Sequence, residues 1–238
     1  MTSPRTRAAA AALAVLALTA GCGGDGDSGG SDGGDFAKES PEKIAEAAKA
    51  DMKALDAVHY SGEISSSGSA VKLDVQASAS GDCTGSVGLG DGTAEVLSVD
   101  GENWFRPDEA FWRQQVPDQA DAVIAAVGDK WVVDTDKQFA QFCDLDEFFA
   151  NVFAADDAKN SYKTVGTDEL GGKDVVKVAN SDDKGTSTGY VVVDDPHYLL
   201  KVERTEGDEP GQIEFSDFDE KFDVQAPAED ETVDLSQQ

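Results

Sequence analysis

The fold of this chain is indicated most directly by the stretch Ala94–Arg106, which reads AEVLSVDGENWFR. Its first half and its last four residues are strand-like runs, and Asp100-Gly101-Glu102 connects them. An Asp-Gly pair marks a tight hairpin turn, because both central residues of such a turn need positive φ angles. In the second strand we expect Trp104 and Phe105 to point to opposite faces of a sheet. The stretch predicts a hairpin of antiparallel strands.

Further strands are predicted on both sides of this hairpin, wherever apolar residues alternate with polar ones between Gly, Asp or Pro turns. Upstream, the alternation runs through Val58, Tyr60 and Ile64, then through 71–77, with 65–69 as the hairpin loop. Downstream, the strand-like runs are 175–178, 189–193, 198–204 and 212–218. The Ala- and Gly-containing run from Ala77 to Gly90 fits either the wall of a cavity or a flexible edge hairpin.

Three helices are predicted from apolar spacing and from capping residues. The first begins at Pro41 behind the N-cap candidate Ser40, and the second covers Ala120 to Val127 behind Asp118. The third follows Asp144 or Asp146. The apolar stripe of the first helix is Ile44, Ala48, Met52 and Leu55, and that of the third is Leu145, Phe148, Phe149, Val152 and Phe153.

The order of helix, strands, helical insertion and further strands resembles the LolA/LolB carrier fold, and especially the LppX/LprG group of actinobacterial lipoproteins. The motifs that carry this resemblance are 99–105, 130–133, 170–178, and 188–195 running into 198–201. It implies an α+β fold over 36–226, in which a curved antiparallel sheet, an incomplete barrel, wraps around helices. In that family the concave face leaves an apolar cavity for acyl chains.

The N-terminus reads as a secretory signal that ends in a lipid attachment site. Arg5 and Arg7 precede an apolar run from Ala8 to Leu18, which is too short for a bilayer span of roughly 20 residues. The next residues, Thr19-Ala20-Gly21-Cys22, resemble a bacterial lipobox. We therefore expect a signal peptide over 1–21, a lipidated Cys22 and a flexible Gly/Ser/Asp tether over 22–35. An ordinary signal with an unmodified Cys22 is the alternative.

The two other cysteines, Cys83 and Cys143, form an even pair in an exported chain, which predicts a disulfide between them. Two buried free thiols are the main alternative. A metal site is not supported, because no histidines lie near them in the sequence.

Charge excludes whole classes of partner. The full chain carries 19 basic and 48 acidic residues, and removal of the signal with Arg5 and Arg7 leaves 17 against 48, a net charge of −31. Such a surface repels phosphate, so we expect no nucleic-acid partner and membrane contact only through the lipid anchor. We expect a monomer on the extracytoplasmic face of the cell membrane, with an acidic tail over 227–238 that frays.

Bulky side chains that could line the cavity can equally pack the core, and packing is the commoner role. These candidates are Trp104, Trp112, Trp131, Phe148, Phe149, Phe153, Tyr190 and Phe215. Catalysis has little support: His59 and His197 sit at strand ends, and no nucleophile elbow or metalloprotease motif occurs. Asp134-Thr135-Asp136 reads as a turn more simply than as a metal ligand set. We expect no enzyme activity, metal or cofactor.

Three functions remain open. The first is a surface lipoprotein that holds or carries an amphiphile, such as a lipid or lipoglycan, in an apolar half-barrel cavity. The second is an envelope-anchored module with a packed core that binds or regulates a protein. An enzyme is the least supported of the three.

Overall fold

The structure, a computed structural model, describes residues 33–66, 68–153, 161–182, 185–207 and 210–237. The predicted signal peptide, Cys22 and most of the tether lie outside these ranges. All described residues belong to one compact unit, Ser31–Gln238.

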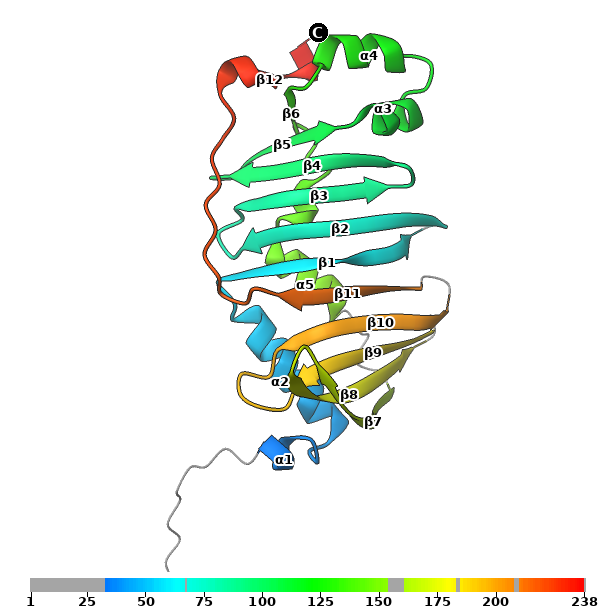
Figure 1. Cartoon of the computed structure of the whole chain (residues 1–238), viewed down its shortest axis with the longest axis vertical. Helices are drawn as coiled ribbons and strands as arrows, with labels where there is room; N and C mark the ends of the chain where they lie inside the picture. Colours follow the sequence, from blue (N-terminus) through cyan, green and yellow to red (C-terminus); the bar gives the residue numbers. More distant parts are fainter. Residues whose placement is uncertain (1–32, 67, 154–160, 183–184, 208–209, 238) are drawn as a thin grey trace, which may run out of the picture. The chain divides into compact units, whose positions relative to one another are not determined.

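Twelve strands in the described residues form a single sheet (Figure 1). Their bounds are β1 Ala57–Ser66, β2 Ser69–Ser78, β3 Cys83–Leu89, β4 Gly92–Val99, β5 Glu102–Pro107, β6 Trp131–Val133, β7 Ser161–Leu170, β8 Lys173–Asp182, β9 Gly185–Val192, β10 Leu199–Gly207, β11 Gly211–Ser216 and β12 Thr232–Val233.

Neighbouring strands follow the order β12-β6-β5-β4-β3-β2-β1-β11-β10-β9-β8-β7. All pairs are antiparallel except β12 with β6. The pairing of β1 with β11, in the register Tyr60 with Phe215, joins the N-terminal and C-terminal halves of the sheet. The sheet begins at β12 and ends at β7 without closing, which confirms the predicted incomplete barrel.

The hairpin around Asp100-Gly101 forms as predicted. Asp100 and Gly101 both have positive φ angles, 52° and 83°, and connect β4 to β5. Phe105 contacts the aromatic side chains of the core, whereas Trp104 pairs with Leu97 on the opposite face of the sheet. The two rings therefore occupy opposite faces.

The helices are α1 Gly33–Phe36, α2 Pro41–Lys53, α3 Glu109–Gln115, α4 Ala120–Val127 and α5 Leu145–Val152, with short 3-10 turns η1 Ala140–Phe142, η2 Glu229–Glu231 and η3 Leu235–Gln237. Ser40 caps α2 and Asp144 caps α5 through its side chain, as predicted. Asp118 was wrongly predicted as a cap, because α4 begins after Gln119 without a side-chain cap. The helix α3 was not predicted; Asp108 caps it.

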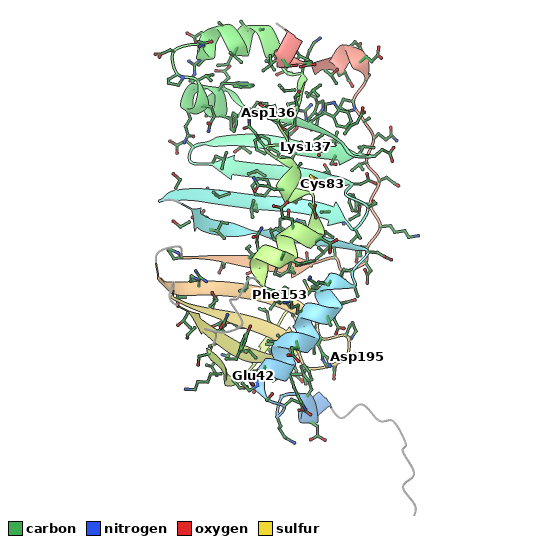
Figure 2. All side chains as sticks on the ribbon, turned by 180° about the vertical axis from the view of Figure 1, so that it is seen from behind. Glu42, Cys83, Asp136, Lys137, Phe153 and Asp195 are labelled. Carbon is green, nitrogen blue, oxygen red and sulfur yellow. A yellow bond between two sulfur atoms is a disulfide. The ribbon has the colours of Figure 1, made fainter. Side chains whose placement is uncertain are left out.

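Helices α2 and α5 cover one face of the sheet and supply the core on that side (Figure 2). Ile44, Ala48 and Met52 of α2 are at most 1% exposed. From β1, Tyr60 reaches across and donates a hydrogen bond to the carbonyl of Phe142 in η1, and its ring stacks on Phe148 at 4.1 Å. This face is the concave face of the half-barrel.

The predicted disulfide is present. Cys83 at the start of β3 is joined to Cys143, which follows η1, with their Cα atoms 5.3 Å apart. Both cysteines are buried. The bond fixes the segment that leads into α5 to the middle of the sheet.

The suggestion of a flexible edge hairpin over Ala77–Gly90 is wrong. The strand β3 lies between β2 and β4 in the interior of the sheet. At Gly85, a Cβ atom would stand 2.2 Å from the carbonyl oxygen of Asp74, so glycine there permits close backbone packing.

Fraying of the C-terminal tail is also contradicted. After β11 the chain runs along one edge of the sheet, across the ends of several strands (Figure 1). Thr232 and Val233 then pair with Trp131 and Val132 of β6, and Val233 and Leu235 pack against the core. These apolar residues anchor a segment whose acidic composition alone predicted disorder.

The predicted tether ends earlier than expected. Residues Gly33–Phe36 form the helical turn α1, and the ring of Phe36 stacks on His197 at 3.5 Å. Packing of this one aromatic side chain orders residues whose Gly and Asp composition predicted coil.

Candidate functional site

A pocket of about 490 Å³ lies between α2, the end of α5 and the concave face of β7–β10. Its floor is aliphatic in one part and polar in another, and its α2 side carries Ala45 and Ala48 with the polar side chains Glu42, Glu46 and Lys49. Figure 2 shows Phe153 at the end of α5 near α2, on which Glu42 lies.

A second pocket of about 320 Å³ adjoins the first, because Asn151, Val152, Ser187, Val202 and Arg204 line both. It extends over β1, β2 and β11, where Ile64, Leu73 and Ile213 form its apolar wall beside Phe148. Pockets of this size and lining are typical of sites for small apolar ligands. We call the two together the concave pocket.

The strand register explains the floor of the concave pocket. Val176, Val191 and Leu199 form one row across β8, β9 and β10. The next row is Val178, Gly189, Val202 and Ile213, two positions further along β8 and β9 and three along β10, where the register shifts after Leu199. Side chains two residues apart point to the same face, so both rows point to the helices.

Gly189 gives the floor its depth. It lies in the second row, and a Cβ atom there would stand 3.1 Å from Cδ1 of Leu199. Every other position of that row carries a branched aliphatic side chain. The missing side chain therefore lets the side chain of Leu199 lie close over the sheet, and both residues line the concave pocket.

A third row is polar. Tyr162, Asn180, Ser187 and Arg204 follow one another across β7 to β10. Nε of Arg204 donates a hydrogen bond to Oγ of Ser187 at 2.9 Å. The side-chain oxygen of Asn180 is buried and has no hydrogen-bond partner within the described residues. The concave pocket thus changes from apolar to polar along the strand direction.

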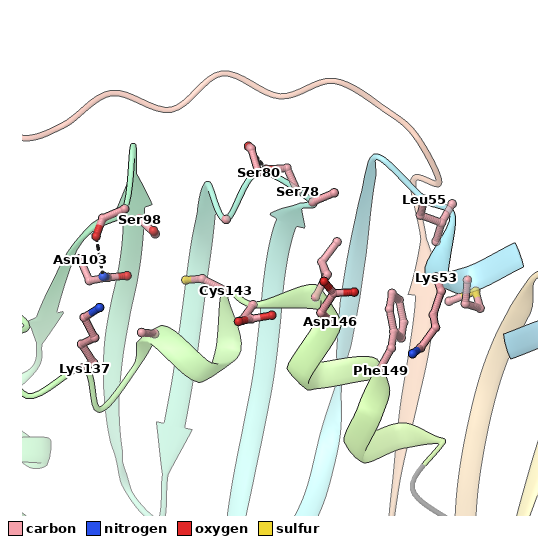
Figure 3. Close-up of a pocket in the computed structure, with 17 residues that line it drawn as sticks. Lys53, Leu55, Ser78, Ser80, Ser98, Asn103, Lys137, Cys143, Asp146 and Phe149 are labelled. Carbon is pink, nitrogen blue, oxygen red and sulfur yellow. Dashed lines mark hydrogen bonds between the residues drawn. The ribbon is translucent and has the colours of Figure 1, made fainter. Parts of the chain in front are cut away.

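A different pocket, of about 330 Å³, opens beyond the N-terminal end of α5 (Figure 3). Ser78, Ser98 and Asn103 from the sheet line it, together with Ser80 from the turn after β2 and with Lys53 and Lys137. Its wall is largely polar, so it does not suit an acyl chain. The helix α5 separates this polar pocket from the concave pocket.

The candidate aromatic residues divide between the two faces of the sheet. Trp112, Phe148, Phe149, Phe153 and Phe215 belong to the core on the concave side. Of these, Phe148 and Phe153 line the concave pocket, Phe149 lines the polar pocket, and Trp112 and Phe215 line neither.

The other three candidates, Trp104, Trp131 and Tyr190, were wrongly assigned to a cavity. They lie at strand positions that point away from α2 and α5. The guanidinium of Arg106 lies 4.6 Å from the ring centroid of Trp131, on the outer face. The register of a strand determines which face of the sheet an aromatic side chain occupies, and the sequence alone did not predict that register.

Tyr190 belongs to a charged cluster on the outer face. Its hydroxyl donates to Glu203 at 2.6 Å, and Lys201 forms an ion pair with Glu203 at 2.6 Å. The hydrogen bond to Glu203 raises the pKa of Tyr190 to about 12. The hydrogen bond from Lys201, followed by that from Tyr190, lowers the pKa of Glu203. These contacts connect β9 to β10 on the outer face, so we assign the cluster a structural role in the sheet.

The histidines and Asp134 have structural partners. Nε2 of His59 lies 2.8 Å from Asp74, and Nδ1 of His197 lies 3.2 Å from the carbonyl of Val192. The carboxylate of Asp134 accepts hydrogen bonds from the backbone N–H groups of Gln138 and Phe139, which is the predicted turn. None of these three side chains lines the concave pocket or the polar pocket.

Sequence reasoning did not single out the aliphatic floor, Gly189 or the polar row as site residues. One signal was available: Gly189 interrupts a strand that is otherwise rich in valine, and such a glycine often marks a close approach or an open space. No comparable signal identified Asn180.

No helix in the described part of the chain is long and apolar enough to cross a membrane.

Comparison with known proteins identifies the fold. LprF from Mycobacterium bovis is 14% identical, with 79% of this chain and 97% of that chain covered and a TM-score of 0.55. The Mycobacterium tuberculosis lipoprotein LppX is 13% identical, with coverage of 79% and 100% and a TM-score of 0.46. No family model and no curated protein matches the sequence. The similarity to LprF confirms the predicted fold of the LppX/LprG group.

Proposed function

We propose that this domain holds an amphiphile in the concave pocket, as a lipoprotein anchored to the extracytoplasmic face of the membrane through Cys22. The observation that carries the proposal is the concave pocket itself: two adjoining spaces of about 320 and 490 Å³ over an aliphatic floor. Transfer of an acyl chain from water to such a floor is favourable by about 0.8 kcal/mol for each buried CH₂ group.

The aliphatic rows favour a lipid ligand over a packed core that serves only as a scaffold. In a filled half-barrel the space that Val178, Gly189 and Val202 line would be occupied by side chains from α2 or α5, because interiors are close-packed. The polar row favours an amphiphile over a pure hydrocarbon. We propose no catalytic step, because the pocket contains neither histidine.

The anchor is supported by the sequence before the described residues. The lipobox-like stretch that ends at Cys22 would place a diacylglycerol at the start of the mature chain, and two acyl chains give stable attachment where one does not. A monomeric domain on a short tether would then receive its ligand at the membrane surface.

Binding of cis-parinaric acid, a fluorescent fatty acid, tests this function. The chain from Asp25 onward keeps every described residue and lacks the acylated cysteine. We expect saturable binding with about one site per chain. In Gly189→Leu, the new side chain projects over the pocket floor, so we expect an affinity loss of roughly tenfold.

Gly88→Leu is the matched control. A Cβ atom at Gly88 would also stand 3.1 Å from its nearest side-chain atom, in this case Cβ of Lys72. Gly88 pairs with Lys72 in β2 and, by the alternation of β3, faces away from the helices. This variant should bind the probe like the parent. Failure of the parent chain to bind, or equal loss in both variants, contradicts the proposal.

A further inference from the structure

Among the described residues, Asn180 carries the one buried side-chain oxygen or nitrogen atom that lacks a hydrogen-bond partner. Its Oδ1 atom is buried and lacks a partner within the described residues. A buried polar atom without a hydrogen-bond partner lowers the stability of the folded state by about 1–3 kcal/mol. Such atoms are therefore rare in native proteins, and each one calls for an explanation, such as a role in binding. The position of this one, in the lining of a pocket, suggests that the missing partner is a ligand.

The register fixes where the side chain stands. Asn180 pairs with Ser187 across β8 and β9, and Ser187 pairs with Arg204 across β9 and β10. All three residues line the larger part of the concave pocket. Because Asn180 stands two positions after Val178, both side chains point to the same face of the sheet. An acyl chain over Val178 and Val202 would therefore end beside Asn180.

We propose that Asn180 selects amphiphiles whose polar part carries a hydrogen-bond donor, a hydroxyl or an amide N–H, next to the acyl chain. This inference rests on the proposed function and adds an orientation to it. The acyl chain lies over the aliphatic rows, and the donor meets Oδ1 of Asn180 at the polar row. Capped or donor-free amphiphiles leave that oxygen unpaired and bind more weakly.

The reason for selectivity is an asymmetry in hydrogen bonding. A site built to bond a ligand hydroxyl rejects the analogue that lacks it, because the polar group of the site then stays buried and unpaired. Ser187 lies opposite Asn180, but no hydrogen bond joins its hydroxyl to Oδ1 of Asn180; the Ser187 oxygen accepts from Nε of Arg204 instead. A donor carried by the ligand would meet the need.

The test compares dodecan-1-ol with 1-methoxydodecane as competitors of cis-parinaric acid. The two share the dodecyl chain and its oxygen; in the ether a methyl group replaces the hydrogen that the alcohol can donate. We expect the chain from Asp25 onward to bind the alcohol about tenfold more tightly than the ether, which equals about 1.4 kcal/mol. In Asn180→Leu the two competitors should become equal.

Asn180→Asp is the second variant. It keeps acceptor oxygens at this position and should keep the preference for the alcohol, so the test does not depend on the stability of Asn180→Leu. Equal binding of both competitors by the parent chain, or a preference that persists in Asn180→Leu, overturns the inference and leaves the proposed function standing. Absence of binding by cis-parinaric acid and both competitors overturns the two together.

Discussion

Tyr60 connects the sheet to the segment that covers it. It is 0% exposed, its hydroxyl donates to the carbonyl of Phe142, and burial raises its pKa. In Tyr60→Phe the ring still stacks on Phe148, but the donor is lost and the carbonyl loses a bond. We expect the free energy of unfolding in urea to fall by about 1–2 kcal/mol.

Tyr198→Phe is the control for this change. The hydroxyl of Tyr198 donates to Asp219 at 3.2 Å in an exposed position, where water can replace the bond. Its removal should change stability by less than about 0.5 kcal/mol. Equal effects of the two substitutions would show that the contact with Phe142 does not stabilise the fold.

The contacts of Glu203 lead us to predict that the stability of the fold depends on pH. Its folded pKa lies below the ordinary value because Lys201 and Tyr190 bond to the carboxylate. Its contribution is therefore present above the unfolded pKa of about 4.3 and is lost as the pH falls through the folded pKa. Urea denaturation should find Glu203→Gln less stable than the parent at pH 6, with a difference that shrinks towards pH 3.

Glu102→Gln, at an exposed position, is the control and should not show this narrowing. A Glu203→Gln curve that stays parallel to the parent between pH 6 and pH 3 would contradict the role assigned to the cluster.

The structural roles of some single residues could be predicted from the sequence, and those of others could not. Ser40, Asp144 and the Asp100-Gly101 turn were predictable, because each acts through its own backbone neighbourhood. The disulfide between Cys83 and Cys143 was predictable because these are the two cysteines that remain once Cys22 is assigned to the lipid anchor. The face occupied by Trp104 or Tyr190 was not, because it depends on a register set by pairing with distant strands. Asn180 gave no local signal at all.

At the scale of elements, the carboxylate of Asp108 both caps α3 and connects it to the sheet. Asp108 accepts from the N–H of Phe111 at 2.7 Å, which caps the helix, and from the N–H of Thr93 at 3.1 Å, which ties it to β4. We expect Asp108→Ala to lower the free energy of unfolding by about 1–2 kcal/mol, and Asp108→Asn by less, because an acceptor remains.

Asp118→Ala provides the comparison. The sequence made Asp118 a cap of α4, but the structure gives that position to Gln119 with no side-chain bond. The substitution should be nearly neutral in the same chemical denaturation experiment. A cost at Asp118 as large as at Asp108 would contradict the assigned caps.

Helices and strands whose apolar residues recur at a regular spacing were predicted, and those without such a spacing were not. The stripe of α2 and the alternation of β1 and β2 identify their structure directly. In contrast, β3 is rich in Gly, Ser and Thr, and β7 is mostly exposed, so neither has a clear apolar pattern. Pairing with neighbours forms these strands, and local sequence carries little of that information. The C-terminal β12 depends in the same way on β6.

At the scale of the whole molecule, the disulfide joins the helical insertion to the sheet. Cys83 and Cys143 are 60 residues apart in the sequence. In the chain-entropy model, closure of a loop of that length stabilises the folded state by about 4 kcal/mol. In urea denaturation we expect the free energy of unfolding of the double variant Cys83→Ala/Cys143→Ala to fall by a large part of this amount. Stability equal to that of the parent under oxidising conditions would contradict a structural role.

The fold class and the broad order of helix, strands, helical insertion and further strands followed from the sequence, whereas most of the residues that line the pocket did not. Whether a concave face is filled or open depends on a few side chains, here the absence of one at Gly189 beside Val178 and Val202. The full chain has a net charge of −29, and Glu42 and Glu46 lie on the α2 side of the concave pocket, away from its aliphatic rows.

The most direct test of the central claim is native mass spectrometry of the chain from Asp25 onward, followed by solvent extraction and lipid analysis. We predict discrete adducts that extraction releases as lipid, at about one per chain, and fewer of them on Gly189→Leu than on Gly88→Leu. A bare protein mass that persists after incubation with a membrane lipid extract would contradict an amphiphile-binding pocket.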